Sequence, residues 1–219
     1  MSAPRRGLPR AADVVIAIVA LVLLSPLLLA AAIAIKLTSR GPVIYRQPRV
    51  GLHGEQFEMW KLRTMREGSD PVGVGTAVVE RDPRVTGPGR VLRRFALDEL
   101  PNLVNVLRGE MAIVGPRATL PAQVALYTER QRRRLELKPG ITGWAQIRGR
   151  TGIPWEQRIE LDVWYAEHRS PLLDLRILAL TPLVLLRGEG AAAPDAYAGS
   201  DEGSALRRAA EREGEGTPR

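Results

Sequence analysis

The longest apolar run of the chain lies near its N-terminus. From Val14 to Ile35 nearly every residue is apolar, and only the pair Ser25-Pro26 interrupts the run. About 20 such residues suffice to cross the hydrocarbon core of a bilayer as an α-helix. The pattern therefore predicts a basic segment over residues 1–12 and a membrane helix over residues 13–37, with Asp13 as its N-cap.

The residues in and beside this run are as compatible with a hairpin that enters and leaves the membrane by one face as with a kinked helix that spans it. Basic residues are retained on the cytoplasmic side. Pro26 bends a helix because it lacks a backbone donor and clashes with the preceding turn, while the Ser25 hydroxyl can satisfy a carbonyl left unpaired. A kinked helix that spans the bilayer is the alternative, and a cleaved signal peptide is disfavoured because the run exceeds the usual length of about 7–15 residues. Both flanks of the run are basic, with Arg5, Arg6 and Arg10 before it and Lys36, Arg40, Arg46 and Arg49 after it.

Shorter periodic segments follow, separated by glycine and proline. Extended-type runs on either side of Gly51–Gly54 predict a short β-hairpin, and apolar residues at helical spacing predict several helices beyond it. The last apolar segment is interrupted by Asp174 and Arg176, so it suits a helix at the membrane interface, or in the core, better than a deep crossing. The predicted strands cover residues 43–47 and 56–62, and the predicted helices cover residues 97–108, 120–137, 151–169 and 172–186.

The predicted fold class is mixed α/β and mainly helical. A re-entrant membrane helix, broken at Ser25-Pro26, packs on one small cytoplasmic domain over residues 38–187, which has interfacial amphipathic helices and a short β-hairpin. A chain of 219 residues with 45% hydrophobic content supports one such domain with a real core. The segment 188–219 is rich in alanine, glycine and charge without apolar periodicity, so we predict a disordered tail.

Composition narrows the chemistry that this domain can perform. The chain has no cysteine, which excludes disulfides, thiolate metal sites and a cysteine nucleophile. It has only two histidines, so a nucleophile or general base is expected to be a carboxylate. The net charge of +8 comes almost wholly from arginine, whose guanidinium binds phosphate oxygens in a bidentate way. We therefore expect phosphate-bearing partners, and no sequence motif favours nucleic acid among them.

The adjacent carboxylates Asp98 and Glu99 are the main chemical candidates. In a structural interpretation, Asp98 caps a helix and Glu99 offsets the helix dipole. In a functional interpretation, an aspartate attacks phosphorus to form an acyl phosphate, and a neighbouring carboxylate holds magnesium. Such a nucleophile approaches a diphosphate only when cations neutralise the charge. Arg93 and the loop Gly115-Pro116-Arg117 could supply them, although each arginine taken singly is more often a solvated charge.

These residues belong to a series of ordered blocks that resembles the bacterial sugar transferase family, specifically its monotopic phosphoglycosyl transferases. The resemblance extends from about Arg10 to Thr181. The chain departs from the family pattern at Ala118, where proline is frequent, and at Ala112, where many members have serine. The matching blocks include Tyr45-Arg46-Gln47, Lys61-Leu62-Arg63-Thr64-Met65, Asp82-Pro83-Arg84-Val85-Thr86, Leu97-Asp98-Glu99-Leu100-Pro101-Asn102, Val114-Gly115-Pro116-Arg117 and Lys138-Pro139-Gly140-Ile141-Thr142-Gly143.

The resemblance implies a two-step transfer of a sugar-1-phosphate from a UDP-sugar to undecaprenyl phosphate, with ping-pong kinetics. Asp98 would attack the sugar-bearing phosphate and expel UMP, and Glu99 would bind Mg²⁺ together with Asp98. Arg93 and Lys61 would bind phosphate, while Pro116-Arg117 would face the nucleotide or phosphate. The resemblance further implies a catalytic domain at the cytoplasmic face of the bacterial inner membrane, in contact with the lipids of that membrane. This domain would start the assembly of exopolysaccharide, capsule, O-antigen or glycoprotein. A homodimer is compatible with the resemblance.

Two rival functions stay open at this stage. A non-enzymatic, membrane-anchored scaffold could bind anionic lipid through its basic surface, in which case Asp98 is only a cap. A metal-dependent lipid phosphatase would release inorganic phosphate instead of UMP, but the scarcity of histidine argues against it. Neither the sugar nor the glycan pathway follows from the sequence.

Overall fold

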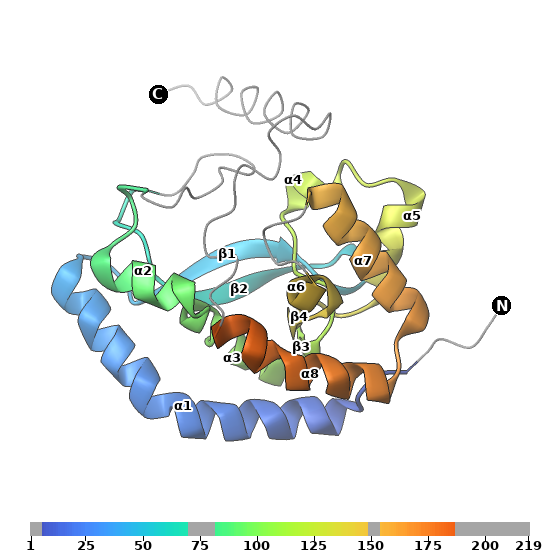
Figure 1. Cartoon of the computed structure of the whole chain (residues 1–219). Coiled ribbons are helices and arrows are strands. Elements are labelled where there is room, and N and C mark those ends of the chain that lie inside the picture. The colour runs from blue at the N-terminus through green and yellow to red at the C-terminus, as the bar shows by residue number, and fades with distance from the viewer. Residues whose placement is uncertain (1–5, 70–81, 149–153, 187–219) are drawn as a thin grey trace.

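The structure is a computed structural model that describes residues 6–69, 82–148 and 154–186. The predicted tail over residues 188–219 lies outside these ranges. Most elements are helices and the strands form two small sheets, so the predicted mixed, mainly helical class is confirmed (Figure 1). In chain order the elements are α1 (Arg10–Thr38), β1 (Ile44–Val50), η1 (Leu52–Gly54), β2 (Gln56–Leu62), α2 (Gly87–Arg94), η2 (Leu97–Glu99), α3 (Asn102–Arg108), β3 (Ala112–Val114), α4 (Pro121–Val124), α5 (Glu129–Arg132), η3 (Arg133–Glu136), β4 (Gly140–Thr142), α6 (Trp144–Arg148), α7 (Trp155–His168) and α8 (Pro171–Leu186).

Helix α1 contains the predicted membrane segment. It runs without interruption from Arg10 to Thr38 and bends near its middle, so the predicted break at Ser25-Pro26 is a bend in one continuous helix (Figure 1). Pro26 lies inside the helix, where a missing backbone donor produces such a bend. The Ser25 hydroxyl donates to the carbonyl of Val22 over 2.8 Å, as expected for a polar group in an apolar helix. Within the described ranges, α1 is the one helix long and apolar enough to cross a membrane.

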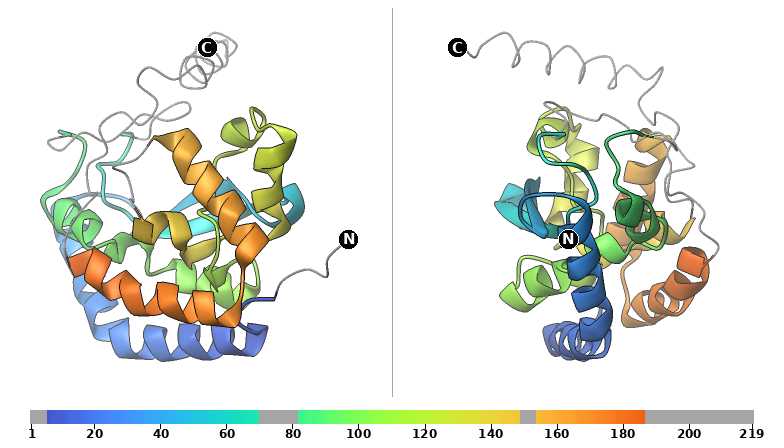
Figure 2. Two further views of the ribbon diagram at one scale, coloured as in Figure 1. Left: turned by 45° about the vertical axis from the view of Figure 1, so that its right-hand side comes forward. Right: turned by 90° about the vertical axis from the view of Figure 1, so that its left-hand side faces the viewer.

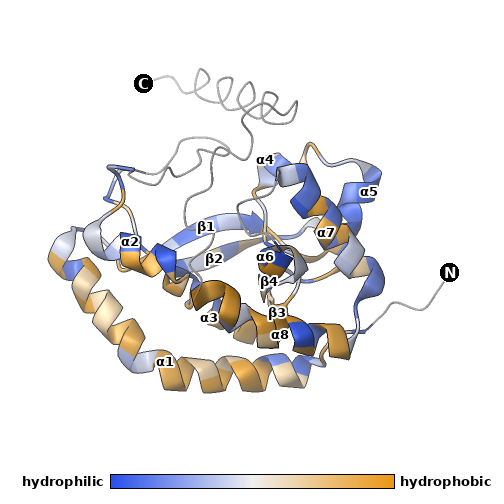
Figure 3. Ribbon diagram, in the orientation of Figure 1, coloured by the Kyte–Doolittle hydropathy of each residue, from blue (hydrophilic) through white to orange (hydrophobic). Residues whose placement is uncertain are grey.

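Many apolar side chains of α1 are exposed. Val22 and Leu23 are exposed, as are Leu172 and Leu175 of α8. Both helices lie along the same lower side of the molecule and are strongly apolar (Figure 3). Exposed apolar surface of this extent marks a contact with membrane or protein. The buried residues of α1 are Asp13, Ala17, Ala31 and Ile35.

Asp13 does not cap α1, and this prediction was wrong. The N-cap is Pro9, and Asp13 lies buried in the first turn, where its carboxylate accepts the backbone N–H of Ile113 over 3.0 Å. Arg10 donates to the carbonyl of Val106 over 2.5 Å. The prediction failed because hydrophobic spacing places a helix start only approximately. The polar contacts of Asp13 and Arg10 attach the first turn of α1 to β3 and α3.

Two small sheets hold the loops of the domain in place. Strands β1 and β2 pair antiparallel from Ile44↔Leu62 to Val50↔Gln56, which confirms the predicted hairpin. Strands β3 and β4 pair parallel. Figure 2 shows the hairpin on one side of the molecule and α7 on another, above α1 and α8. The main core lies between these elements and includes Ala17, Val106, Met111, Ile113, Tyr165 and Ile177.

The predicted helix over residues 120–137 is divided into α4, α5 and η3, so this prediction was wrong. Thr128 begins a new helix because its side chain accepts the backbone N–H of Gln131 and the Gln131 side chain bonds back to the Thr128 backbone. Hydrophobic spacing does not reveal such an internal cap. The predicted helix over residues 151–169 corresponds to α7, although residues 151–153 lie outside the described ranges, and the apolar segment 172–186 forms most of α8.

Candidate active site

Asp98 and Glu99 lie in a short turn between two helices. Helix α2 ends at Arg94, and Ala96 then adopts a left-handed conformation with φ 53° and ψ 26° before η2 begins. A residue with a side chain adopts this conformation at a cost of about 1–2 kcal/mol, and such strain is frequent at functional sites. The next helix, α3, has Pro101 as its N-cap. The interpretation of Asp98 as a helix cap was therefore wrong.

Glu99 joins three segments that are distant in sequence. Its Oε1 accepts Lys61 Nζ of β2 at 2.9 Å and Arg117 Nη2 at 2.6 Å. Its Oε2 accepts Arg117 Nη1 at 3.2 Å. The side chains of Lys61 and Glu99 are 15% and 14% exposed, and that of Arg117 is 45% exposed. The structure thus brings these three predicted site residues together at a place that solvent still reaches.

The pKa values of the two carboxylates are shifted in opposite directions. Burial raises the pKa of Asp98, and the charge of Glu99 raises it further, against the opposing effect of Lys61, Arg93 and Arg117. Burial would also raise the pKa of Glu99, but Arg117 and Lys61 outweigh it and hold this pKa far below its usual value. Glu99 is therefore a fixed anion. Asp98 accepts no hydrogen bond from the described residues, so its carboxylate is available for chemistry.

Arg93 reaches the site from α2. The charge of Arg93 acts on Asp98, and the helix that carries it is fixed at its start, where the Thr86 side chain accepts the backbone N–H of Gly89 over 3.1 Å. A Cβ on Gly89 would lie 2.1 Å from the carbonyl oxygen of Thr64, so only glycine allows this approach to the segment after β2. Three cations thus act on two carboxylates, and the excess positive charge suits a diphosphate.

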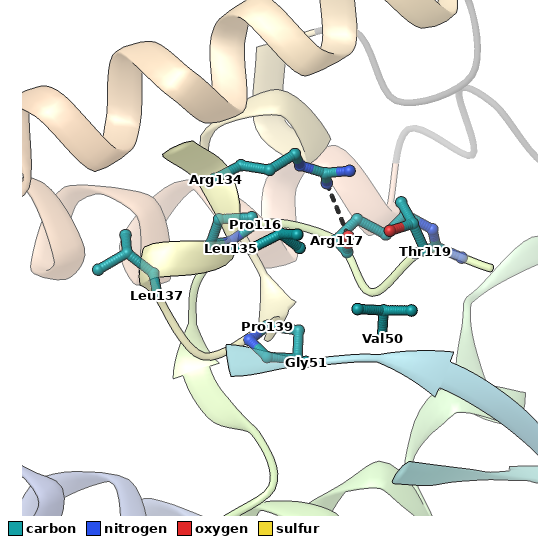
Figure 4. A pocket seen from close by; sticks show the side chains of 9 residues that line it. All are labelled: Val50, Gly51, Pro116, Arg117, Thr119, Arg134, Leu135, Leu137 and Pro139. Atoms are coloured by element: carbon teal, nitrogen blue, oxygen red, sulfur yellow. Dashed lines mark hydrogen bonds between the residues drawn. The ribbon is translucent and has the colours of Figure 1, made fainter. Parts of the chain in front are cut away.

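Pro116 anchors the loop that carries Arg117. Pro116 is buried, and its carbonyl accepts the backbone N–H of Gly140 over 2.8 Å, while Gly115 N–H donates to the carbonyl of Thr142 over 2.9 Å. The loop is thereby fixed to β4. Figure 4 shows Pro116 and Arg117 at a small pocket whose other lining residues are Val50, Gly51, Thr119, Arg134, Leu135, Leu137 and Pro139.

Asp98 and Glu99 supply carboxylate oxygens, a ligand type that suits magnesium. No group of three or more His, Cys, Asp or Glu residues that could hold a metal occurs in the part of the chain that the structure describes. Magnesium commonly binds through one or two carboxylates together with substrate phosphates and water. Asp98 and Glu99 would therefore hold such an ion only together with further ligands, such as phosphate oxygens and water.

Comparisons with known proteins identify the family. The family model described as "Bacterial sugar transferase" matches residues 5–188. The chain belongs to the bacterial sugar transferase family. This sugar transferase is 45% identical to the "Uncharacterized sugar transferase EpsL" of Bacillus subtilis, with 84% of the chain and 89% of that protein covered.

Two further relatives bear names that state a role. The chain is 44% identical to the "UDP-glucose:undecaprenyl-phosphate glucose-1-phosphate transferase" of Escherichia coli, covering 83% of the chain but only 40% of that longer protein. It is 40% identical to the "Exopolysaccharide production protein ExoY" of Sinorhizobium fredii, with 81% and 85% covered. The family predicted from the sequence motifs is thereby confirmed.

Some residues that shape the site of this sugar transferase were not predicted. Asn105 is fully buried, and its side chain accepts Trp60 N–H at 3.1 Å and donates to the Glu58 carbonyl at 2.7 Å, which fixes β2 and hence Lys61 against α3. Asp162 and Arg134 form a buried ion pair. Asp162 shares the apolar stripe of α7 with Ile159 and Val163. A charged residue on such a stripe is a sequence signal that could have indicated a buried ion pair. Trp144 is buried and stacks on Trp164.

Proposed function

We propose that this sugar transferase moves a sugar-1-phosphate from a UDP-sugar to undecaprenyl phosphate in exopolysaccharide assembly. The observation that carries the proposal is the Asp98 carboxylate, which accepts no hydrogen bond from the described residues and is acted on by the charges of Lys61, Arg93 and Arg117. The names of the relatives support the two substrates and the polysaccharide product.

In the first step, a carboxylate oxygen of Asp98 attacks the phosphorus that bears the sugar. The bond from this phosphorus to the bridging oxygen breaks, and UMP leaves with the electron pair, so that a phosphosugar-aspartyl intermediate remains. Arg117 and Lys61, which already neutralise Glu99, lie where they can also stabilise the charge that develops on the phosphate oxygens. The raised pKa of Asp98 indicates a poorly solvated carboxylate, which is a stronger nucleophile than a hydrated one.

In the second step, a phosphate oxygen of undecaprenyl phosphate attacks the same phosphorus. The bond to Asp98 breaks, the carboxylate is regenerated, and the polyprenyl diphosphate sugar leaves. Asp98 and Glu99 would hold Mg²⁺ during the reaction, and the ion would supply charge neutralisation for the diphosphate. UMP must leave before undecaprenyl phosphate reacts, so ping-pong kinetics follow.

The proposal places α1 in the cytoplasmic leaflet of the inner membrane as a re-entrant, bent helix. The bend at Pro26, the exposed apolar surface of α1 and the basic residues on both flanks support this topology. In this arrangement the exposed apolar residues of α8 lie at the membrane interface, which brings the site within reach of a lipid-borne phosphate.

The test is release of UMP by the protein in nanodiscs with Mg²⁺, undecaprenyl phosphate and a panel of UDP-sugars that includes UDP-glucose. Wild type should release UMP with at least one donor, and Asp98→Asn should release none. Glu136→Gln, which changes an exposed carboxylate, is the matched control and should retain wild-type activity. Release of inorganic phosphate would favour a phosphatase. Absence of turnover with every donor in a folded protein would favour a lipid-binding scaffold.

A further inference from the structure

Arg134 and Asp162 form a buried ion pair beside the loop that carries Arg117. Arg134 lies in η3 and Asp162 in α7, and each side chain is 3% exposed. The guanidinium of Arg134 donates to the Asp162 carboxylate and to the hydroxyl of Tyr127. Because two charges lose much hydration free energy on burial, such a pair is weak evidence for a role in stability alone.

This pair holds the backbone of Arg117 at its carbonyl. Arg134 donates to the Arg117 carbonyl over 2.7 Å, the contact drawn as a dashed line in Figure 4. Asp162 pairs with the guanidinium of Arg134 and so fixes the group that makes this contact. The side chain of Arg117 bonds to Glu99 over 2.6 Å. Arg117 therefore connects the buried pair to the candidate active site.

We infer that Arg134 and Asp162 are positioning residues that fix Arg117 for binding of the donor diphosphate. The inference rests on the proposed function, which gives Arg117 a phosphate to bind. The Arg134 bond to the Arg117 carbonyl fixes the backbone of Arg117, and the bonds from its guanidinium to Glu99 fix the end of its side chain. A displacement of about 1 Å in a group that orients substrate lowers the rate on the order of 10²-fold.

The first experiment compares Asp162→Asn with Glu160→Gln. Both residues lie in α7 and pair with an arginine, but the Glu160–Arg130 pair is exposed. Asp162→Asn should lower kcat/KM for the UDP-sugar by about 10- to 100-fold and leave KM for undecaprenyl phosphate unchanged. Glu160→Gln should stay within about twofold of wild type for both substrates.

A double-mutant cycle separates positioning from a general effect on folding. In an Arg117→Ala background, Asp162→Asn should change kcat/KM for the donor by less than about twofold, because its route to the substrate is gone. A purely structural role would lower activity by the same factor in both backgrounds. Hydrogen exchange of residues 112–120 gives a readout without substrate, and it should be faster in Asp162→Asn but not in Glu160→Gln.

A second variant covers the outcome in which Asp162→Asn does not fold. Arg134→Met with Asp162→Leu removes both charges together and avoids a buried unpaired ion. This double variant should keep the wild-type melting temperature and still show the donor-specific loss. Wild-type donor kinetics in a folded double variant, or equal losses in both backgrounds, would overturn the inference. If wild type itself turns over no donor, the proposed function fails. In that case hydrogen exchange still tests the positioning of the Arg117 loop, and exchange in Asp162→Asn that equals the wild-type exchange would overturn it.

Discussion

Replacing Gly115 with alanine should displace the loop that carries Arg117. A Cβ at this position would lie 2.3 Å from the carbonyl oxygen of Lys138 and 2.8 Å from the backbone nitrogen of Gly140. Ordinary contact requires about 1 Å more than the shorter of these distances, and the obstacle is backbone rather than a flexible side chain. Strands β3 and β4 must therefore separate locally, and Pro116-Arg117 moves with β3.

The expected magnitude follows from this overlap. Overpacking of this kind costs about 1–3 kcal/mol, which lowers the melting temperature of a domain of this size by about 2–12 °C. A shift of about 1 Å at Arg117 should lower kcat/KM for the nucleotide-sugar on the order of 10²-fold. The assay is UMP release at a temperature where the variant is fully folded, with differential scanning fluorimetry in detergent for the melting temperature.

Gly87→Ala is the matched control for this experiment. Gly87 begins α2, has no positive φ, and no atom lies within 4 Å of the position that a Cβ would occupy. Alanine there should leave both activity and melting temperature close to wild type. If Gly115→Ala were as active and as stable as Gly87→Ala, the close approach of β3 and β4 would not be what holds Arg117 in place.

Three further predictions concern other parts of the molecule. Lys61→Met should lower kcat on the order of 10²-fold in the UMP assay with little loss of melting temperature, because Arg117 still holds Glu99; unchanged kcat would remove Lys61 from the site. Because hydrogen bonds from Arg84 hold the pKa of Asp82 at about 2, below its ordinary value of 3.8, this carboxylate stabilises the fold fully above about pH 4 and progressively less as the pH falls toward 2. The difference in melting temperature between wild type and Asp82→Asn should therefore shrink over that interval, and a constant difference would contradict the pairing. Since the chain has no cysteine, Ser2→Cys introduces a single thiol that reports the side of the membrane on which the N-terminus lies. An impermeant maleimide added outside the cell should not label this thiol, unless a second substitution, Pro26→Ala, straightens α1. Labelling with Pro26 intact would contradict a re-entrant helix.

The local elements of this fold could be predicted where a strong periodic signal exists. The apolar run of α1 and the hairpin around Gly51–Gly54 depend on sequence-local patterns, and both were predicted. The helix expected over residues 120–137 was wrong because Thr128 and its partner side chain restart the helix, and hydrophobic spacing carries no trace of such a cap. The wrong N-cap at Asp13 has a similar cause, since a carboxylate near a helix start can bond to a distant strand instead.

The site could be predicted only in part because its geometry depends on contacts between distant segments. The resemblance to the family pointed to Lys61, Glu99 and Arg117, and the structure brings these three side chains together. No local pattern distinguishes Arg134 from its arginine neighbours, although the structure shows that it alone in its run is buried against Asp162. Predicting such a partner requires the fold first.

The covalent role of Asp98 is the central claim, and mass spectrometry of the intact protein tests it most directly. Protein incubated with its UDP-sugar donor and Mg²⁺, but without undecaprenyl phosphate, should release about one UMP per protein and gain the mass of one phosphosugar. Added acceptor should then remove that mass, and Asp98→Asn should neither release UMP nor gain mass. Rapid product formation by wild type without any mass gain, or a mass gain that persists in Asp98→Asn, would contradict nucleophilic catalysis by this carboxylate.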